Sequence, residues 1–379
     1  MPEQFRALIV ILFVATVVFF LARRPATDLI PDRDFKRRRN LWFLITLLAF
    51  FSFSFWVYTA AAVITLFLAR RREHNAMALF FMLLFAIPPA SVEIPGFGVI
   101  NYLIELNHIR ILTVCILLPT ALALSKQSDT VRFGRTLPDK LLAASLVLMT
   151  LLYLRDTTVT DTLRQAVSLY IDVFLPYYVA SRGLKTLDDF KDALLAFVLA
   201  AFLLAIIAVA EFARHWLLYN GLISAMGVKW SMSSYLSRGG SLRASATTGQ
   251  AIALAYVISV AIGMFLFVQG YVRNRLQRYM GALLLAAGLV VPLSRGPWIG
   301  AGVIVAVFIA TGKGAVKRLT LLACAGLLAL PLLAVLPGGE KVLDLLPFVG
   351  NLEKENITYR QRLLDNSWIT IQRLSLIHI

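Results

Sequence analysis

The run "LWFLITLLAFFSFSFWVYTAAAVITLFLA" at residues 41–69 decides how this chain folds. It carries no charged residue, it is long for one membrane crossing, which takes about 20 residues, and it is short for two. It is therefore either one tilted helix or a tight hairpin near Ser52 to Trp56, and the number of helices in the fold depends on which.

The rest of the chain has the same apolar character. Of its 379 residues, 59% are hydrophobic and 15% charged, and the mean hydropathy is +0.77, which is more than a soluble core could bury. The alternating strands of a membrane barrel are absent. We predict an all-α polytopic membrane bundle of about 11–12 transmembrane helices. They are expected at residues 5–22, 41–69, 76–90, 103–125, 139–155, 166–181, 190–213, 247–269, 279–293, 297–312 and 317–336.

The net charge of +16 sits largely in short loops, so we interpret it as setting orientation and expect no nucleic acid partner. The basic segments predicted to be cytoplasmic are 70–75, 126–140, 181–191, 271–279 and 312–318. The opposite, external face then receives 91–102, 156–165, 214–246, the turn 294–296 and the chain after about 337. The seven basic residues of 23–39 favour the hairpin and an external N-terminus, although one tilted helix stays open.

One arginine is not explained by orientation. In "PLSRGPWIG" at residues 292–300, Arg295 lies on the face that positive charge avoids. Gly296 permits an open backbone, and Pro297 suits the first turn of the next helix. A helix start beside a guanidinium makes an anion site. The alternative is an arginine that reaches toward lipid headgroups.

The loop 214–246 adds cations on the same face. It holds Arg214, Lys229, Arg238 and Arg243 and no acidic residue. We expect Arg243 to lie near the membrane surface, and Glu211 to orient a nearby arginine. The alternative for the loop is an interfacial segment whose aromatic belt consists of Trp216, Tyr219, Trp230 and Tyr235.

Other ionisable groups lie inside apolar runs and need partners: Asp172, and Glu105 with Arg110, which we expect to pair. Cys115 and Cys324 also lie in apolar runs, so we predict neither a disulfide nor a metal site.

Three stretches carry a resemblance: "RASATTGQAIALA" (243–255), "SRGPWIGA" (294–301) and "ITYRQRLLDNSWITIQR" (357–373). They resemble the O-antigen ligase/polymerase superfamily of bacterial envelope glycosyltransferases. The resemblance implies a GT-C-like bundle in the bacterial inner membrane. It implies transfer of a glycan from an undecaprenyl-pyrophosphate carrier to a glycan, lipid or protein acceptor, among membrane lipid and without a cofactor or metal.

The resemblance also implies roles for individual residues. Arg243 and Arg295 match the arginines thought to hold the carrier's pyrophosphate, and we expect both to be catalytic. Arg360 matches the arginine that opens the large external loop. The residues expected to bind substrate are Arg238, Arg360, Glu211 and Ser294.

The expected organisation has four parts. Residues 1–242 form N-terminal helices with the external loop 214–246, residues 243–336 form the ligase-related core, and 337–373 begin a large external loop. The last six residues, "LSLIHI", match a translated transposon mosaic end, so 374–379 are expected to be an adapter artefact on a truncated, inactive fragment. A flippase of lipid-linked saccharides and a non-catalytic scaffold remain alternatives, and polymerase is not separated from ligase.

Overall fold

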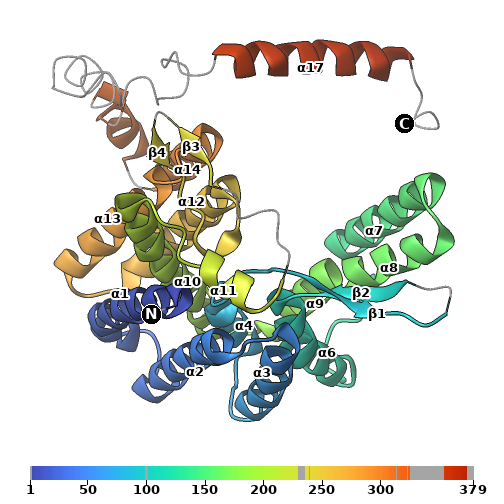
Figure 1. The fold of residues 1–379 in the computed structure, drawn as a ribbon. Helices are drawn as coiled ribbons and strands as arrows, with labels where there is room; N and C mark the ends of the chain where they lie inside the picture. The colour runs from blue at the N-terminus through green and yellow to red at the C-terminus, as the bar shows by residue number, and fades with distance from the viewer. Residues whose placement is uncertain are drawn as a thin grey trace. The chain divides into compact units, whose positions relative to one another are not determined.

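The computed structural model describes residues 2–98, 101–228, 235–238, 240–312, 314–321, 323–324 and 354–373. Helices account for nearly all of the regular secondary structure in this part of the chain, with two short β-hairpins (Figure 1). The chain divides into two compact units, Met1–Ile304 and Val305–Ile379, and each is described by itself. The fold is therefore nearly all-α, as predicted.

The described helices are α1 Glu3–Thr27, α2 Asp32–Phe51, α3 Phe55–Arg70, α4 Ala76–Leu83, α5 His108–Leu112, α6 Leu118–Ser125, α7 Leu137–Asp156, α8 Val159–Leu169, α9 Leu175–Gly183, α10 Leu187–Arg214, α11 Asn220–Ala225, α12 Ala251–Val268, α13 Arg275–Val290, α14 Arg295–Ala310 and α17 Lys354–Arg373. Two π-helical segments, η1 Thr113–Leu117 and η2 Tyr170–Phe174, join α5 to α6 and α8 to α9. The strands are β1 Val92–Pro95, β2 Tyr102–Leu106, β3 Ser237–Arg238 and β4 Ser241–Leu242.

Five helical segments are long and apolar enough to cross a membrane. They are Glu3–Thr27, His108–Ser125, Leu137–Asp156, Leu187–Arg214 and Ala251–Tyr271. The helices Phe55–Arg70 and Arg295–Ala310 are shorter but also apolar. The chain is thus a membrane protein, and much of the predicted helix 317–336 lies outside the described residues.

The run 41–69 is a hairpin. Helix α2 ends at Phe51 and α3 begins at Phe55, and the Ser52 hydroxyl donates to the Leu48 carbonyl at 2.6 Å beside the bend. The predicted loop 23–39 is wrong, because most of it is helical: α1 runs to Thr27 and α2 begins at Asp32. Lys36 pairs with the Asp32 carboxylate at 2.6 Å, an i,i+4 contact that supports this first turn of α2.

The predicted helix 103–125 starts later than expected. Residues 102–106 form β2, which pairs antiparallel with β1, and Asn107 then caps α5 by accepting from the Arg110 amide at 3.0 Å. The π-helical turns have a common cause. Pro119 and Pro176 lack the amide hydrogen that an α-helix requires, so each preceding turn shifts to a wider hydrogen-bond pattern.

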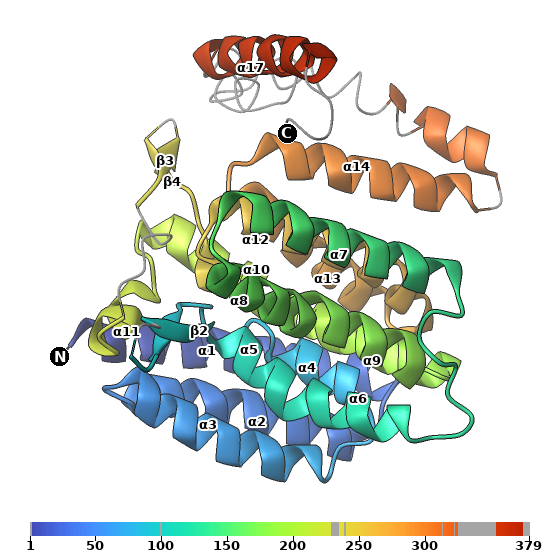
Figure 2. The same ribbon diagram turned by 90° about the vertical axis from the view of Figure 1, so that its right-hand side faces the viewer.

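Helix α10 is the central element of the first unit. It packs against α1, α4, α12 and α13 (Figure 2), and most of its apolar residues are buried. It crosses α13 where Gly288 lies against Ala205: a Cβ added to the glycine would come within 2.6 Å of the Ala205 Cβ. The crossing therefore requires glycine, since a side chain would push the two helices apart.

Contacts between distant segments show which of them share an end of the bundle. Arg38 of α2 donates from Nη2 to Glu73, which follows α3, and to Asp192 of α10, each at 2.8 Å. Glu73 and Asp192 lie in or beside segments predicted to be cytoplasmic, 70–75 and 181–191. The basic residues of 23–39 thus lie with that group, which is the arrangement that the hairpin at 41–69 requires.

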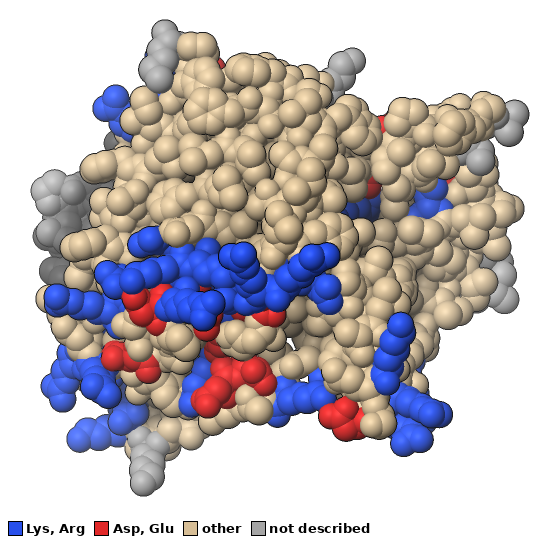
Figure 3. All heavy atoms as spheres, turned by 90° about the horizontal axis from the view of Figure 1, so that it is seen from below, with Lys and Arg blue, Asp and Glu red and all other residues tan. Residues whose placement is uncertain are grey.

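Two further contacts extend this end. Lys185 Nζ lies 2.7 Å from the Asp129 carboxylate, and the Arg273 amide donates to Asp28 Oδ2 at 3.4 Å. Figure 3 shows the result on one face, where Lys, Arg, Asp and Glu gather below a broad surface that is almost free of charge. Such a division is typical of a helix bundle that crosses an apolar layer.

The segments predicted to be external also meet one another. Arg164 of α8 donates from Nη2 to the Tyr102 carbonyl of β2 at 2.6 Å. The Trp216 ring nitrogen donates to the Glu3 carboxylate at 2.8 Å, which joins the N-terminus to the loop 214–246. These contacts agree with the prediction that 156–165 shares an end with 91–102, and the loop 214–246 with the N-terminus.

Candidate functional site

The candidate site is the turn between α13 and α14. Its backbone is strained at Leu293, a non-glycine residue in the left-handed region with φ 51°. The Leu293 carbonyl accepts from Arg238 Nη1 at 2.5 Å, and the Pro292 carbonyl accepts from Arg243 Nε at 3.1 Å. The turn thus presents two successive carbonyl groups to two arginines that lie about 50 residues earlier in the sequence.

Ser294 completes these contacts. Its side chain is buried, its hydroxyl accepts from Arg243 Nη2 at 2.8 Å, and it donates to the Pro292 carbonyl at 3.2 Å. Together with the Nε contact, this fixes the plane of the Arg243 guanidinium. The acceptors in these contacts are uncharged groups, and they orient the guanidinium.

The small hairpin of β3 and β4 brings the two arginines to the turn. Arg238 pairs with Ser241 across the hairpin, and Gly240 at its tip has φ 78°, a conformation that favours glycine. The Arg243 amide donates to the Leu236 carbonyl at 2.8 Å. This hydrogen bond extends the pairing of the hairpin by one residue on each side, to Leu236 and Arg243. The residues 229–234 and 239 lie outside the described part of the chain, and with them Lys229 and Trp230.

Glu211 fixes the segment that follows Arg243. The carboxylate lies in the last turn of α10 and is 1% exposed. Oε2 accepts from the Ser245 amide at 3.1 Å and from the Ala246 amide at 2.8 Å, while Oε1 accepts from the Leu218 amide at 3.0 Å. We expected Glu211 to orient a nearby arginine, but in these contacts it binds backbone amides. Two of them belong to the residues two and three positions after Arg243.

Arg295 is the first residue of α14 and is partly buried. The helix starts two residues before the predicted position, because Pro297 falls in its first turn, where a missing amide hydrogen costs nothing. The Trp298 ring nitrogen donates to the Leu289 carbonyl at 2.7 Å and anchors this start to α13. Arg295 directly follows Ser294, whose hydroxyl Arg243 contacts, so the start of α14 adjoins the residues that bind Arg243.

Arg360 lies in α17 of the second unit, where the structure describes its helical backbone. The suspected adapter residues 374–379 lie outside the described residues. The structure thus brings together Arg238, Arg243 and Ser294 at the start of α14, next to Arg295 in the sequence, while Glu211 contacts the backbone of the segment after Arg243.

The expected pair of Glu105 and Arg110 is wrong. Glu105 is exposed on β2, and Arg110 forms a forked contact with Asp172, in which Nη2 lies 2.7 Å from Oδ2 and Nε lies 3.1 Å from both carboxylate oxygens. Arg110 reaches the backbone carbonyl of Glu105 instead. Asp172 lies on the π-helical segment η2, so the pair ties two bent helices together.

Tyr219 is not part of an aromatic belt. It is 2% exposed, packs with its ring 6.1 Å from that of Phe50, and has a raised pKa because it is buried. Tyr235, by contrast, is 58% exposed. The loop 214–246 is therefore partly a packed element: α11 and the residues before it pack onto the bundle, and the hairpin β3–β4 carries the arginines.

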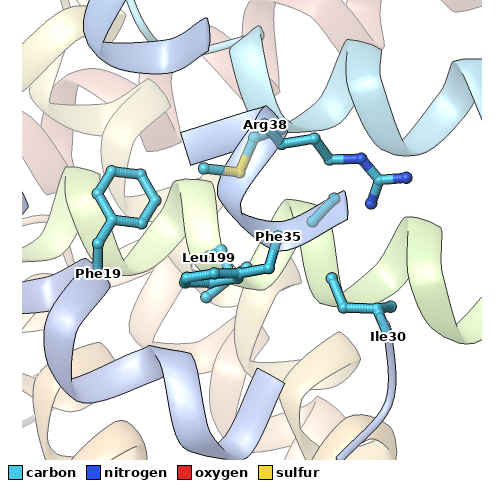
Figure 4. Close-up of a pocket in the computed structure, with 7 residues that line it drawn as sticks. Phe19, Ile30, Phe35, Arg38 and Leu199 are labelled. Carbon is cyan, nitrogen blue, oxygen red and sulfur yellow. The ribbon is translucent and has the colours of Figure 1, made fainter. Parts of the chain in front are cut away.

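A second group of charged side chains, around Arg38, suits a structural role. Arg38 lies beside a cavity of about 10 Å³, room for about one water, lined by Phe19, Ile30, Phe35, Met82, Ala196 and Leu199. Figure 4 shows its guanidinium directed away from the rings of Phe19 and Phe35. The cavity is too small for a substrate.

Chemically, this arrangement can bind an anion. Three arginines and the amide groups of a helix start gather at one turn, and the described residues contain no group of three or more His, Cys, Asp or Glu side chains placed to hold a metal ion. The Pro292 and Leu293 carbonyls could not be predicted, because backbone acceptors leave no sequence signal. Comparison with known protein families, characterised proteins and solved structures finds no match.

Proposed function

We propose that the protein is a membrane glycosyltransferase of the bacterial inner membrane. It polymerises or ligates an oligosaccharide that is carried on undecaprenyl pyrophosphate, and it does so at the external face of the membrane. Its fold is a GT-C-like bundle of 11–12 transmembrane helices. The observation that supports this most is the convergence of Arg238 and Arg243 on the turn 292–294, next to Arg295 at the start of α14. A pyrophosphate carries the charge that such a group of cations would bind.

In this proposal the arginines act on the leaving group. When the bond between the anomeric carbon and the carrier oxygen breaks, negative charge grows on the pyrophosphate. Guanidinium groups that are already fixed in place stabilise that charge without first reorganising. Arg243 and Arg295 are the catalytic residues, Arg238 and Arg360 contribute to binding the carrier, and Ser294 and Glu211 position Arg243 and its loop.

The acceptor is a hydroxyl or amide of a glycan, lipid or protein. Its oxygen or nitrogen forms the new bond to the sugar as the bond to the carrier oxygen breaks, and its proton passes to the departing pyrophosphate. The proposal includes no metal ion and no cofactor. Transfer should therefore continue at an unchanged rate in the presence of EDTA.

The test is glycan transfer in membrane vesicles that contain the product of the full-length gene and are supplied with the lipid-linked oligosaccharide. Arg243→Ala and Arg295→Ala should each lower the rate by at least about a hundredfold, in the range of a lost transition-state contact. Arg214→Ala is the matched control, because Arg214 is exposed at the end of α10 in the same loop and is not among the residues whose described hydrogen bonds reach the turn 292–294. Full activity of both variants would refute the proposal.

A further inference from the structure

The end of the bundle opposite the candidate site carries a second basic feature. A cavity of about 390 Å³ lies where η4 Gln269–Tyr271 leads from α12 into α13. Its lining consists of Gln269, Arg275, Arg278, Tyr279 and Ala282. The volume is in the range of cavities that bind small ligands.

The cavity has an unbalanced charge. Arg275 and Arg278 lie one turn apart on α13, so both guanidinium groups project from one face of the helix. No acidic residue lines the cavity, and among the described residues neither arginine forms an ion pair. Gln269 adds an amide that can donate a hydrogen bond. The polar part of the cavity is thus built to attract an anion.

An apolar surface continues from this charge along the helix. Tyr279 is 73% exposed, Leu283 is 72% exposed and Val290 is 50% exposed, and their spacing places them on one side of α13. A soluble anion would gain nothing from this stripe. A phospholipid matches both parts, because its phosphate reaches the arginines while its acyl chains lie along the apolar side.

A neighbouring cavity is less suited to an anion. It is lined by Arg23 and Arg24 of α1 but also by Asp32. Hydrogen bonds from Arg23 and Lys36 lower the pKa of Asp32 to about 2, so this carboxylate stays ionised and offsets one of the two cations. The geometry therefore points to the cavity at α13.

We propose that the cavity at Arg275 and Arg278 binds the headgroup phosphate of an anionic phospholipid in the adjoining leaflet. Basic cavities between membrane helices are known to select such headgroups. This site lies at the end of the bundle away from Arg243, so it does not depend on the proposed transfer reaction.

The test is native mass spectrometry of the full chain in detergent, with equal amounts of phosphatidylglycerol and phosphatidylcholine of the same acyl chains. The wild type should retain phosphatidylglycerol at least about fivefold more often, and Arg275→Gln with Arg278→Gln should remove that preference. The control is Arg71→Gln with Arg72→Gln, two exposed arginines at the same end that line neither of these two cavities. It should keep the preference.

Three results would overturn the proposal. The α13 double variant could keep the preference, or the control could lose it equally, which would mean a general charge effect. Glycerol phosphate could compete as well as the lipid, which would mean a site for a free phosphate. Arg275→Lys with Arg278→Lys, which retains both charges, should keep at least part of the preference, and an unchanged melting temperature of the variants excludes misfolding as the cause.

Discussion

Glu211 illustrates how one buried carboxylate can define the position of a distant side chain. Its two oxygens accept from three backbone amides, two of which belong to the segment directly after Arg243. Ala246, one of the two, has φ 46°, a conformation that costs energy for a residue with a side chain. The carboxylate therefore stabilises a loop shape that the backbone alone would not adopt.

Glu211→Gln tests this role. The amide nitrogen of glutamine would face a backbone N–H, and one buried donor would lose its acceptor, at a cost of about 1–3 kcal/mol. The melting temperature in detergent should fall. Glu93→Gln is the control, because Glu93 is exposed on β1, and it should leave the melting temperature unchanged. An equal effect of the two changes would contradict the role.

At the other end of the bundle, Arg38 is a buried charged residue that also binds several partners. It is 3% exposed and contacts the carboxylates of both Glu73 and Asp192. Burial alone would raise the pKa of Glu73, but the hydrogen bonds and charge of Arg38, aided by Arg37, hold that pKa below its usual value. Glu73 therefore stays ionised, and its pairing stabilises the fold above pH 4.5, the ordinary value, and less as the pH falls below it.

Arg38→Met should destabilise the protein by about 3–5 kcal/mol at pH 7, because it leaves two carboxylates without their shared cation. The difference in melting temperature from the wild type should shrink as the pH falls below about 4.5, where protonation removes the need for that cation. Arg33→Gln, an exposed change on the same helix, is the control. A difference that grows on acidification would rule out this explanation.

At the scale of elements, the crossing of α10 and α13 connects the bundle to the site. The C-terminal end of α10 carries Glu211, and the C-terminal end of α13 leads into the turn that Arg238 and Arg243 contact. The distance between α10 and α13 is set where Gly288 of α13 contacts Ala205 of α10. A shift at this crossing would move the turn relative to the loop that Glu211 holds.

Gly288→Val tests the crossing. The added side chain would overlap Ala205, with an overpacking cost of about 1–3 kcal/mol, and should lower both the melting temperature and the transfer rate. Gly302→Ala is the control, because a Cβ at Gly302 meets nothing within 4 Å. If Gly288→Val has the same melting temperature and transfer rate as this control, the close approach of α10 and α13 contributes to neither stability nor activity.

At the scale of the whole molecule, the sequence predicted more of the fold than of the site. Long apolar runs reveal helices because a ~30 Å layer demands them, and the basic residues of 23–39 favoured the hairpin at 41–69 that the structure contains. The strand at residues 102–106 was missed, since a five-residue strand has little periodicity of its own. The contacts of Glu211 and Arg238 could not be predicted, because their partners are backbone groups.

The grouping of loops into two ends leads to a prediction about sidedness. In a chain without Cys115 and Cys324, a cysteine at Asn101 should react with an impermeant maleimide in intact cells. A cysteine at Ser128 should react only after permeabilisation, because it lies among the basic segments. Both positions are exposed, so access to the thiol does not limit the reaction. Labelling of both from outside would contradict the arrangement.

The central claim is that the arginines at the start of α14 hold a pyrophosphate, and its most direct test is equilibrium binding of undecaprenyl pyrophosphate to the purified chain. We predict that the chain binds undecaprenyl pyrophosphate more tightly than undecaprenyl monophosphate. The affinity for the pyrophosphate should fall about tenfold or more in Arg243→Ala and in Arg295→Ala, since a charge-assisted hydrogen bond contributes about 1.5–3 kcal/mol. It should not fall in Arg214→Ala. Equal affinity of both arginine variants and the wild type for the pyrophosphate would contradict it.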